Sequence, residues 1–198
     1  MDAVRVALLR EVLAGTEWLG ATRRFAGVLR GSVVAHGGGL LLAGTRAYEP
    51  WHLAAHLVDE AAWSGTPELA PTLVRHHAHP SDPAHLAVGP GRIEEARRGE
   101  TLLVVTPEEP AELLERVHAA RRAGVTVLAL GAGGGELTEM AHETLAVPEG
   151  AELDLDSVQH LVSAAAGENA GSPRVRRGFR DRMSRLAEIL TAPPAAPW

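Results

Sequence analysis

The order of short apolar runs and helix-like segments constrains the fold of this chain more than any other feature. In residues 101–130, TLLVVTPEEPAELLERVHAARRAGVTVLAL, two continuous apolar runs flank a segment with helical spacing. A continuous apolar run of this length predicts a strand that is covered on both faces. A strand, a helix and a second strand in this order predict a right-handed crossover between parallel strands. The chain is therefore predicted to be an α/β protein.

The same alternation extends over most of the sequence. Apolar runs predict strands at 40–44, 72–76, 101–105, 125–130 and 143–147. Segments with helical spacing predict helices at 2–14, 17–36, 49–63, 107–123, 136–141, 152–166 and 174–190. Strands that alternate with helices pack as one sheet between two helical layers. We therefore expect a three-layer αβα sandwich with a five-stranded parallel sheet.

The length of 198 residues favours one domain, because a chain of this size can form one well-packed core. We expect this domain to cover 1–198. Its parts are N-terminal helices over 1–36, an α/β core over 40–166, a C-terminal helix over 174–190 and a loose tail over 191–198.

Composition and charge exclude several classes of function. The chain has no cysteine, which excludes disulfides, thiolate zinc sites and cysteine nucleophiles. Its net charge of −6 gives the whole molecule no electrostatic attraction to nucleic acid or to an anionic membrane. The N-terminal segment lacks the continuous apolar stretch of a signal peptide, and no apolar run is long enough to span a bilayer. We expect a cytoplasmic protein with no nucleic-acid or membrane partner.

The segment 174–190, RVRRGFRDRMSRLAEIL, separates apolar and basic residues on a predicted helix. The apolar face holds Val175, Phe179, Met183, Leu186 and Leu190, and most of the arginines lie elsewhere. One interpretation is nucleic-acid binding. The acidic total charge favours the other, in which the helix packs on the body and its arginines face solvent or an acidic partner.

Glutamates follow the strand predicted at 101–105, where a phosphate-binding protein would have a small Gly- or Ser-rich loop. Thr106 is a plausible N-cap, Pro107 fits the first helical turn, and Glu108 and Glu109 favour the positive end of the helix dipole. We therefore predict a stabilised helix start here. A site for a cation or an amino sugar is the alternative.

Histidines form the second candidate site. On the helix predicted at 49–63, one stripe holds Glu49, His52, His56, Asp59 and Trp63, opposite Leu53, Leu57 and Ala61. His52 and His56 are four residues apart, so they can share a metal ion such as zinc. The alternative is a solvent-facing or subunit-facing stripe.

A His-rich segment follows the strand predicted at 72–76. It holds His76, His77, His79, Asp82 and His85. Because ligand sites form at the carboxyl ends of parallel strands, these residues could meet His52 and His56. The alternative is a polar loop without a ligand, since no fixed metal spacing is present.

The order of these parts resembles the sugar isomerase (SIS) domain family, and its phosphoheptose isomerase branch most. Residues 98–148 carry the main resemblance, with GETLLVVT, then a helix that ends in AARRAGVTVLALGAGGGELTEMAHETLAVP. A looser match runs back through VVAHGGGLLLAGT and HLAAHLVDE to the N-terminus. The resemblance implies a SIS-like fold with flavodoxin-like topology and self-association as a dimer or tetramer, with ligand clefts between subunits.

The differences from the family fall on its phosphate-binding loops. After the first strand, AGTRAYEPWH supplies Thr45 and Arg46 in place of a small Gly/Gly/Ser turn. After the strand at 101–105, only Thr106 keeps a hydroxyl before Glu108 and Glu109. Two carboxylates beside a phosphate would repel it by about 1 to 4 kcal/mol per pair. We name all five as candidate ligand-binding residues, in a phosphate site that is lost or altered.

The resemblance also implies catalytic residues. In the resembled isomerases, a helix near the C-terminus donates a catalytic histidine from a neighbouring subunit, and His160 is the matching candidate here. A sugar isomerase needs an acid and a base on either side of an enediol. Glu60, or Asp59, is the carboxylate that we pair with His160.

Two functions follow from this resemblance. The first is a divergent SIS protein that binds a sugar derivative, or acts as a non-catalytic regulatory or scaffolding protein. The second is a phosphosugar aldose/ketose isomerase of the phosphoheptose type, with phosphate held by Arg46 and the backbone at Thr106. A sugar or sugar phosphate is the possible ligand, and a divalent metal such as zinc is the possible cofactor.

Overall fold

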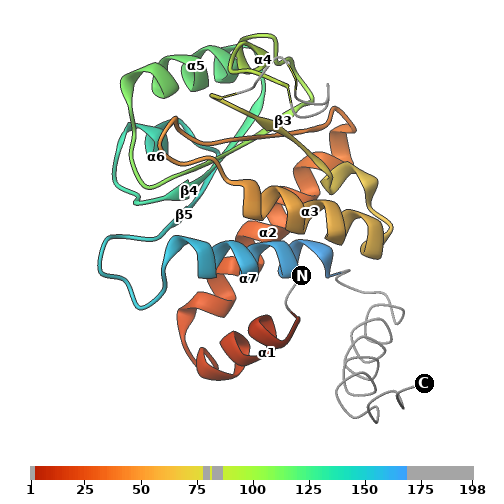
Figure 1. Ribbon diagram of the computed structural model, residues 1–198, viewed down its shortest axis with the longest axis vertical. Coiled ribbons are helices and arrows are strands. Elements are labelled where there is room, and N and C mark those ends of the chain that lie inside the picture. Colours follow the sequence, from red (N-terminus) through yellow and green to blue (C-terminus); the bar gives the residue numbers. More distant parts are fainter. Residues whose placement is uncertain (1–2, 78–80, 82–86, 169–198) are drawn as a thin grey trace, which may run out of the picture.

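The computed structural model describes residues 3–77, 81 and 87–168, and it confirms the predicted α/β architecture (Figure 1). The helices are α1 (Ala3–Val12), α2 (Glu17–His36), α3 (Trp51–Ser64), α4 (Gly91–Glu94), α5 (Ala111–Arg122), α6 (Glu136–Met140) and α7 (Leu155–Gly167), with a 3-10 turn η1 (Pro67–Leu69). The strands are β1 (Leu40–Ala43), β2 (Pro71–Val74), β3 (Thr101–Thr106), β4 (Thr126–Gly131) and β5 (Glu143–Ala146). None of the described helices combines the length and apolar character needed to cross a membrane.

The five strands form one parallel sheet in the order β2-β1-β3-β4-β5. Leu40 in β1 pairs with Pro71 in β2 on one side and with Thr101 in β3 on the other. This is the flavodoxin-like order, in which the chain reverses its direction across the sheet between β1 and β3. Ligands of such sheets bind outside the carboxyl ends of the strands at this switch point.

Helices cover both faces of the sheet. In Figure 1, α4, α5 and α6 lie on one face, and α2, α3 and α7 lie on the other, with α1 beyond them. Successive strand residues alternate between the two layers, as the pleat requires. Leu42, Leu103 and Leu128 pack with α2, α3 and α7, whereas Leu41 and Leu102 pack with the opposite layer. The continuous apolar runs therefore fill two separate cores.

Three predicted helix starts were wrong, and the simplest case is the helix expected from 152, which begins at Leu155 after its N-cap Asp154. The other two involve glutamates. The helix expected from Pro107 begins at Ala111, after the second proline of the segment. A residue that precedes a proline is pushed out of the helical region, so Glu109 cannot continue a helix into Pro110. The helix expected from Glu49 begins at Trp51, and Glu49 lies in the loop before it. Both corrections move glutamates out of helices and into loops.

The predicted helix at 174–190 and the tail at 191–198 lie outside the described residues. The same is true of His79, Asp82 and His85. The extent of a single domain over 1–198 therefore stays a prediction.

Candidate functional site

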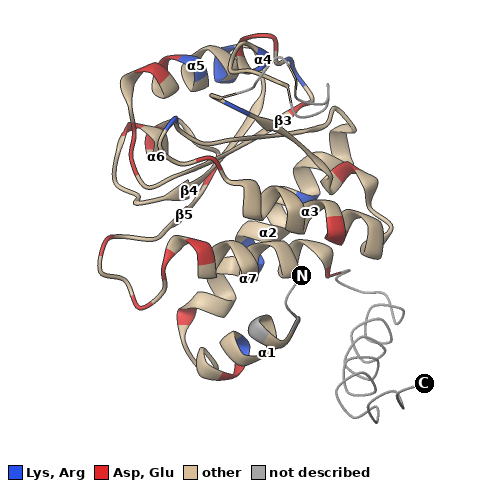
Figure 2. Cartoon of the chain, viewed as in Figure 1, with Lys and Arg blue, Asp and Glu red and all other residues tan. Residues whose placement is uncertain are grey.

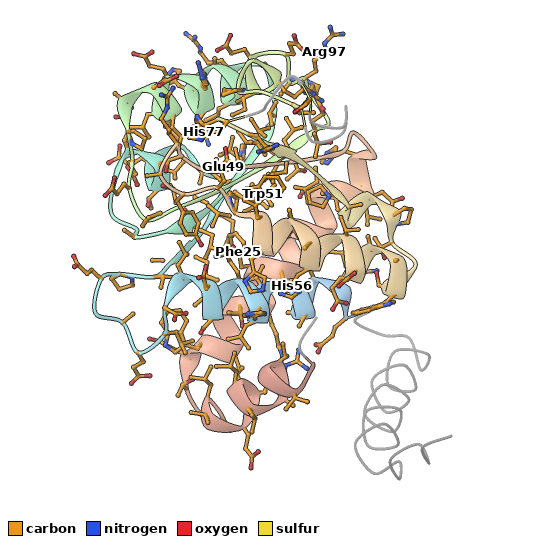
Figure 3. All side chains as sticks on the ribbon, in the orientation of Figure 1. Phe25, Glu49, Trp51, His56, His77 and Arg97 are labelled. Carbon is orange, nitrogen blue, oxygen red and sulfur yellow. The ribbon has the colours of Figure 1, made fainter. Side chains whose placement is uncertain are left out.

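Three histidines meet where α3 packs on α7. His52 and His56 lie one turn apart on α3, and His160 comes from α7. Their ring centroids are 4.4 Å apart for His52 and His56, 4.5 Å for His52 and His160, and 4.7 Å for His56 and His160. Figure 3 shows His56 at the level where α3 and α7 lie together. The predicted metal pair and the predicted catalytic histidine thus form one cluster.

His56 is the inner member of the cluster. Its side chain is buried, and neither ring nitrogen has a hydrogen-bond partner among the described residues. Burial, and then the neighbouring His160 and His52, lower the pKa of His56 to about 4. The ring is therefore neutral at pH 7, which is the form that binds a metal ion.

The nitrogens of this cluster are close to the spacing of a metal site. One nitrogen from each of His52, His56 and His160 lies within 4.8 Å of the other two. An ion at the centre of such a triangle would lie at most about 2.8 Å from each nitrogen, against the usual zinc distance of about 2.0 to 2.1 Å. Shifts of less than about 1 Å per ring would close this gap. The three histidines can therefore hold zinc with a fourth position left open.

Glu60, the predicted catalytic carboxylate, is buried beside the same helix pair. It lies one turn beyond His56 on α3, and its carboxylate packs against Gly167 of α7. A Cβ at position 167 would lie 1.9 Å from Glu60 Oε2, so glycine is needed for this approach. Gly167 is two turns from His160 along α7, about 10 Å. The Glu60 carboxylate and His160 thus lie at the same interface between α3 and α7, but about two helical turns apart along α7.

A polar network that the sequence did not indicate links the loop after β1 to α7. The Tyr48 hydroxyl donates to Asp156 Oδ1 at 2.7 Å and accepts from Gln159 Nε2 at 2.6 Å. Burial, and then the hydrogen bond to Asp156, raise the pKa of Tyr48 above its usual value. Tyr48 thus stays protonated, and it fixes the loop that carries Thr45 and Arg46 against the helix that carries His160.

Glu49 turns away from the histidine cluster and toward the end of β2. Its Oε1 accepts the backbone N–H groups of His76 at 2.6 Å and His77 at 3.2 Å, and its Oε2 accepts Trp51 Nε1 at 3.0 Å. The guanidinium of Arg75 lies 4.5 Å from the Trp51 ring centroid. Figure 3 shows Glu49, Trp51 and His77 in this region. The first and second loops of the carboxyl edge are therefore tied together by one carboxylate.

His76 belongs to this edge and not to the group of three histidines. Its Nε2 lies 3.1 Å from the carbonyl oxygen of Gly44. Within the described part of the chain, the group able to share a metal consists of His52, His56 and His160.

The two glutamates after β3 make different contacts. Thr106 Oγ1 hydrogen-bonds within its own loop, where it accepts the N–H of Glu108 and donates to the Glu108 carbonyl. Glu109 Oε2 accepts the N–H of Leu137 at 3.1 Å, and its carboxylate fills the space beside Gly135. The expected N-cap at Thr106 is thus wrong. Glu109 instead stabilises the start of α6, far along the chain.

A cleft opens at the switch point of the sheet. It has a volume of about 150 Å³ and is lined by Thr45, Arg46, His76, Pro90, Ile93, Pro110, Glu112, Leu113 and Arg116. The structure therefore brings Thr45 and Arg46 to the cleft, whereas Thr106, Glu108 and Glu109 do not line it in the described residues. Arg116 was not predicted from the sequence, since one arginine on an amphipathic helix gives no signal.

Arg116, which lines the cleft, is held by two glutamates. Its Nε lies 3.2 Å from Glu94 Oε1, and its Nη2 lies 3.1 Å from Glu112 Oε1. Its Nη1 is buried and has no hydrogen-bond partner among the described residues. A buried donor without a partner is costly, and a ligand oxygen would satisfy it.

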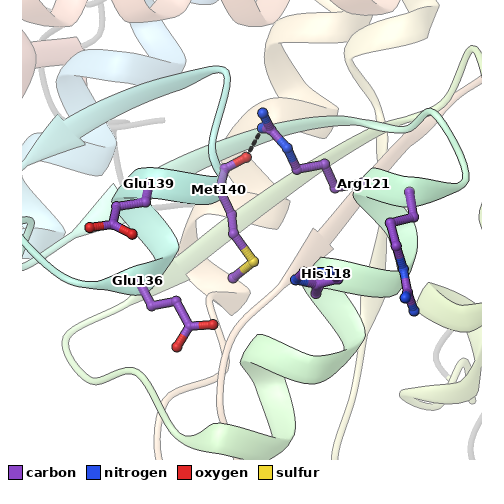
Figure 4. Close-up of a pocket in the computed structure, with 6 residues that line it drawn as sticks. His118, Arg121, Glu136, Glu139 and Met140 are labelled. Atoms are coloured by element: carbon purple, nitrogen blue, oxygen red, sulfur yellow. Dashed lines mark hydrogen bonds between the residues drawn. The ribbon is translucent and has the colours of Figure 1, made fainter.

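A second depression, between α5 and α6, has a volume of about 470 Å³ (Figure 4). It is lined by His118, Arg121, Arg122, Glu136, Glu139 and Met140. Basic and acidic side chains balance one another there, and Arg121 donates to the Met140 carbonyl. This depression lacks the excess of basic groups that the switch-point cleft has.

The sheet order, the helical layers and the switch-point cleft define an α/β protein with a five-stranded parallel sheet of flavodoxin-like order. A scan against protein-family models finds no match, and a search of curated proteins finds none either. Solved structures of sugar and sugar-phosphate proteins share the fold.

Three of these structures illustrate the extent of the overlap. A proposed sugar-binding protein from Salmonella typhimurium matches with a TM-score of 0.54 and 14% identity over 96% of this chain and 56% of its own. A proposed phosphosugar isomerase from Silicibacter pomeroyi matches with a TM-score of 0.51 and 16% identity. The match covers 96% of this chain and 53% of the isomerase chain. The Vibrio vulnificus NanR protein, complexed with ManNAc-6P, matches with a TM-score of 0.50 and 14% identity. The match covers 86% of this chain and 62% of the NanR chain. The chain thus spans little more than half the length of these proteins, and the likeness is one of fold.

Proposed function

We propose that the protein binds a sugar phosphate, or a sugar derivative with another anionic group, in the cleft at the switch point of the sheet. The observation that carries this proposal is that two arginines, Arg46 and Arg116, line the cleft, and that the buried Nη1 of Arg116 has no hydrogen-bond partner among the described residues. An anion there would accept hydrogen bonds from guanidinium groups, which suit phosphate geometry. The ManNAc-6P complex of the NanR protein supports this class of ligand.

The arrangement of the glutamates removes the main objection to an anionic ligand. Glu109 is engaged with the N–H of Leu137, and Glu49 with the N–H groups after β2. The carboxylate that does line the cleft, Glu112, is paired with Arg116. Because Glu49, Glu108 and Glu109 do not line the cleft in the described residues, the repulsion expected from a row of glutamates is reduced, and Arg46 adds attraction.

Binding without catalysis is the function that we favour. A regulatory or scaffolding role would use the cleft as a sensor for the sugar. Phosphosugar isomerisation of the phosphoheptose type is the alternative, with Glu60 and His160 as acid and base. Its support is that both side chains are buried at one helix interface, although they lie at different levels of that interface.

A zinc ion in the three-histidine cluster is the second part of the proposal. The buried, unpartnered nitrogens of His56 and the spacing of the three rings support it. Zinc with three protein ligands has an open position for water or substrate, where it polarises a bound oxygen. His160 would then be a metal ligand, and it could not also serve as the base of an isomerase.

The ligand test is calorimetric titration with ManNAc-6P, ManNAc and inorganic phosphate. Binding of the phosphorylated sugar, weakened at least about tenfold by Arg116→Ala or Arg46→Ala, is expected from the loss of one charge-assisted contact. Arg122→Ala is the matched control, since Arg122 lines the other depression. Weakening by Arg122→Ala alone would place the ligand between α5 and α6 and refute the proposed cleft.

Turnover separates the binding role from the isomerase. Pentose and heptose phosphates are incubated with the wild-type protein and with His160→Ala, and ketose formation is followed. Turnover that His160→Ala abolishes, in a variant that stays folded, would overturn the non-catalytic proposal.

Self-association as a dimer or tetramer is a separate part of the proposal, and it has a separate readout. Light scattering of the purified chain measures the molar mass directly. A monomer at micromolar concentration would contradict it.

A further inference from the structure

Helix α1 is apolar on two faces. One face packs on the core through Val6 and Leu9, and Leu13, directly after the helix, is buried beside them. On the other face, Val4, Leu8 and Val12 have exposed fractions of 42%, 57% and 78%. We call these three residues the α1 stripe. A helix that is apolar on both faces is normally covered on both.

The chain leaves the described structure beside α1. Glu168, which directly follows α7, forms an ion pair with Arg10 in the last turn of α1, with Nη2 and Oε1 2.5 Å apart. Thirty residues, 169–198, follow it in the sequence. The six residues from Glu168 to Arg174 can span about 20 Å, and α1 is only about 15 Å long. A segment that begins at residue 174 can therefore reach any part of the α1 stripe.

The sequence at 174–190 has an apolar face that matches the α1 stripe. Val175, Phe179 and Met183 recur every four residues, as do Val4, Leu8 and Val12. Both rows would extend about 12 Å along a helix. Two helices with apolar rows of this spacing can pack ridge against groove.

Charge favours the same contact. Residues 169–198 hold six arginines against Asp181 and Glu188, a net charge of +4, so residues 1–168 carry −10 of the total of −6. In Figure 2, Asp and Glu positions are marked in red on several helices and loops of the described part of the chain. Glu11 and Glu17, near the end of the α1 stripe, are exposed. A basic segment tethered next to an acidic body is held there by attraction.

We propose that residues 174–190 of the same chain dock as a helix on the α1 stripe and bury Val4, Leu8 and Val12 beneath Val175, Phe179 and Met183. Helices of this length are marginal in isolation, and Gly178 lies in the middle of this one. Packing on α1 supplies the stability that the segment lacks by itself. The arginines then face outward as a basic surface on an otherwise acidic protein.

The absence of cysteine makes this contact directly measurable. In the full chain, the pair Leu8→Cys and Phe179→Cys places two thiols within disulfide reach when the helices pack. Mild oxidation should then give a crosslink within one chain, seen as faster migration on a non-reducing gel. The matched control combines Leu8→Cys with Arg177→Cys, because residue 177 points to the other side of the predicted helix.

The proposal predicts that the Phe179 pair crosslinks at least about tenfold faster than the Arg177 pair, and that added salt slows it. Equal rates, or no crosslink within the chain, would overturn it. A disulfide-linked dimer of Leu8→Cys alone would overturn it too, because a second copy would then cover α1. As a second readout, Phe179→Asp should speed amide hydrogen exchange in α1 at least about tenfold, and unchanged exchange would count against docking.

Discussion

The imidazole rings of His56 and His160 lie 4.7 Å apart, centroid to centroid, although α3 and α7 stand at opposite ends of the α/β core sequence. Both side chains are buried, and His52 completes the group from the rim. The neutral ring of His56 is sensitive to protons and to metal ions, because both compete for the same lone pairs.

Acid should destabilise the metal-free protein through His56. Because the pKa of His56 is lowered to about 4, the unfolded chain binds more protons than the native state between pH 6.5 and pH 4. The stability contributed by the neutral ring is complete above pH 6.5 and is lost as the pH falls from 6.5 to about 4. His52, His160 and Asp59 face the same ring and will modulate the profile.

Urea unfolding at several pH values, with EDTA present, measures this effect. His56→Gln should flatten the profile between pH 6.5 and 4, whereas His118→Gln, at an exposed position, should leave it unchanged. If His56→Gln lost the same free energy of unfolding in acid as the wild-type protein, other groups would be responsible for the effect.

Zinc should stabilise the protein through the three histidines. Saturation at a hundred times the dissociation constant adds about 2.7 kcal/mol to the free energy of unfolding, or several degrees in Tm. His52→Ala should abolish this gain while it changes the metal-free stability little, because His52 is exposed. A zinc-dependent shift that survives in His52→Ala, or the absence of any shift in wild type, would refute the metal site.

Glu109 should matter for stability and Glu108 should not. Glu109→Ala removes the acceptor of the Leu137 N–H and should cost about 1 to 2 kcal/mol. The exposed Glu108 contacts Thr106 through its backbone, so Glu108→Ala should change stability by less than about 0.5 kcal/mol. Thermal unfolding of the two variants decides this, and equal losses would contradict the assigned role of Glu109.

Gly44 should be essential for the loop that carries Thr45 and Arg46. A Cβ at this position would lie 2.0 Å from the Tyr48 carbonyl oxygen, so Gly44→Ala must displace backbone. We expect a loss of at least about 2 kcal/mol and weaker sugar-phosphate binding. Gly27→Ala is the control, because that position is open on α2 and alanine should add about 0.5 to 1 kcal/mol there. If Gly44→Ala changed neither the free energy of unfolding nor the binding, the loop would be able to accommodate a Cβ.

Local pattern predicted most of the fold. The runs at 101–105 and 125–130 were identified as strands because continuous apolar sequence suits a strand covered on both faces, and β3 and β4 lie there. The sequence predicts the start of α5 too early, because Glu108 and Glu109 suit the positive end of a helix dipole whereas Pro110 excludes helical geometry at the residue before it.

The candidate site was predicted only in part. The spacing of His52 and His56 indicated one shared face, and the resemblance pointed to His160, but nothing local indicated that the three would meet. Arg116, Tyr48 and Asp156 gave no sequence signal, since their partners lie far away along the chain. The assignment of catalytic, ligand-binding and metal roles to these residues stays a prediction.

The sequence by itself determined which segments are strands and helices, because apolar periodicity acts over a few neighbouring residues. It also determined that the sheet is parallel, because each crossover needs a helix. The tertiary structure decided which side chains share a space. The contacts between His56 and His160, between Glu109 and Leu137, and between Tyr48 and Asp156 depend on how packed helices and loops meet, and no local preference encodes that distance.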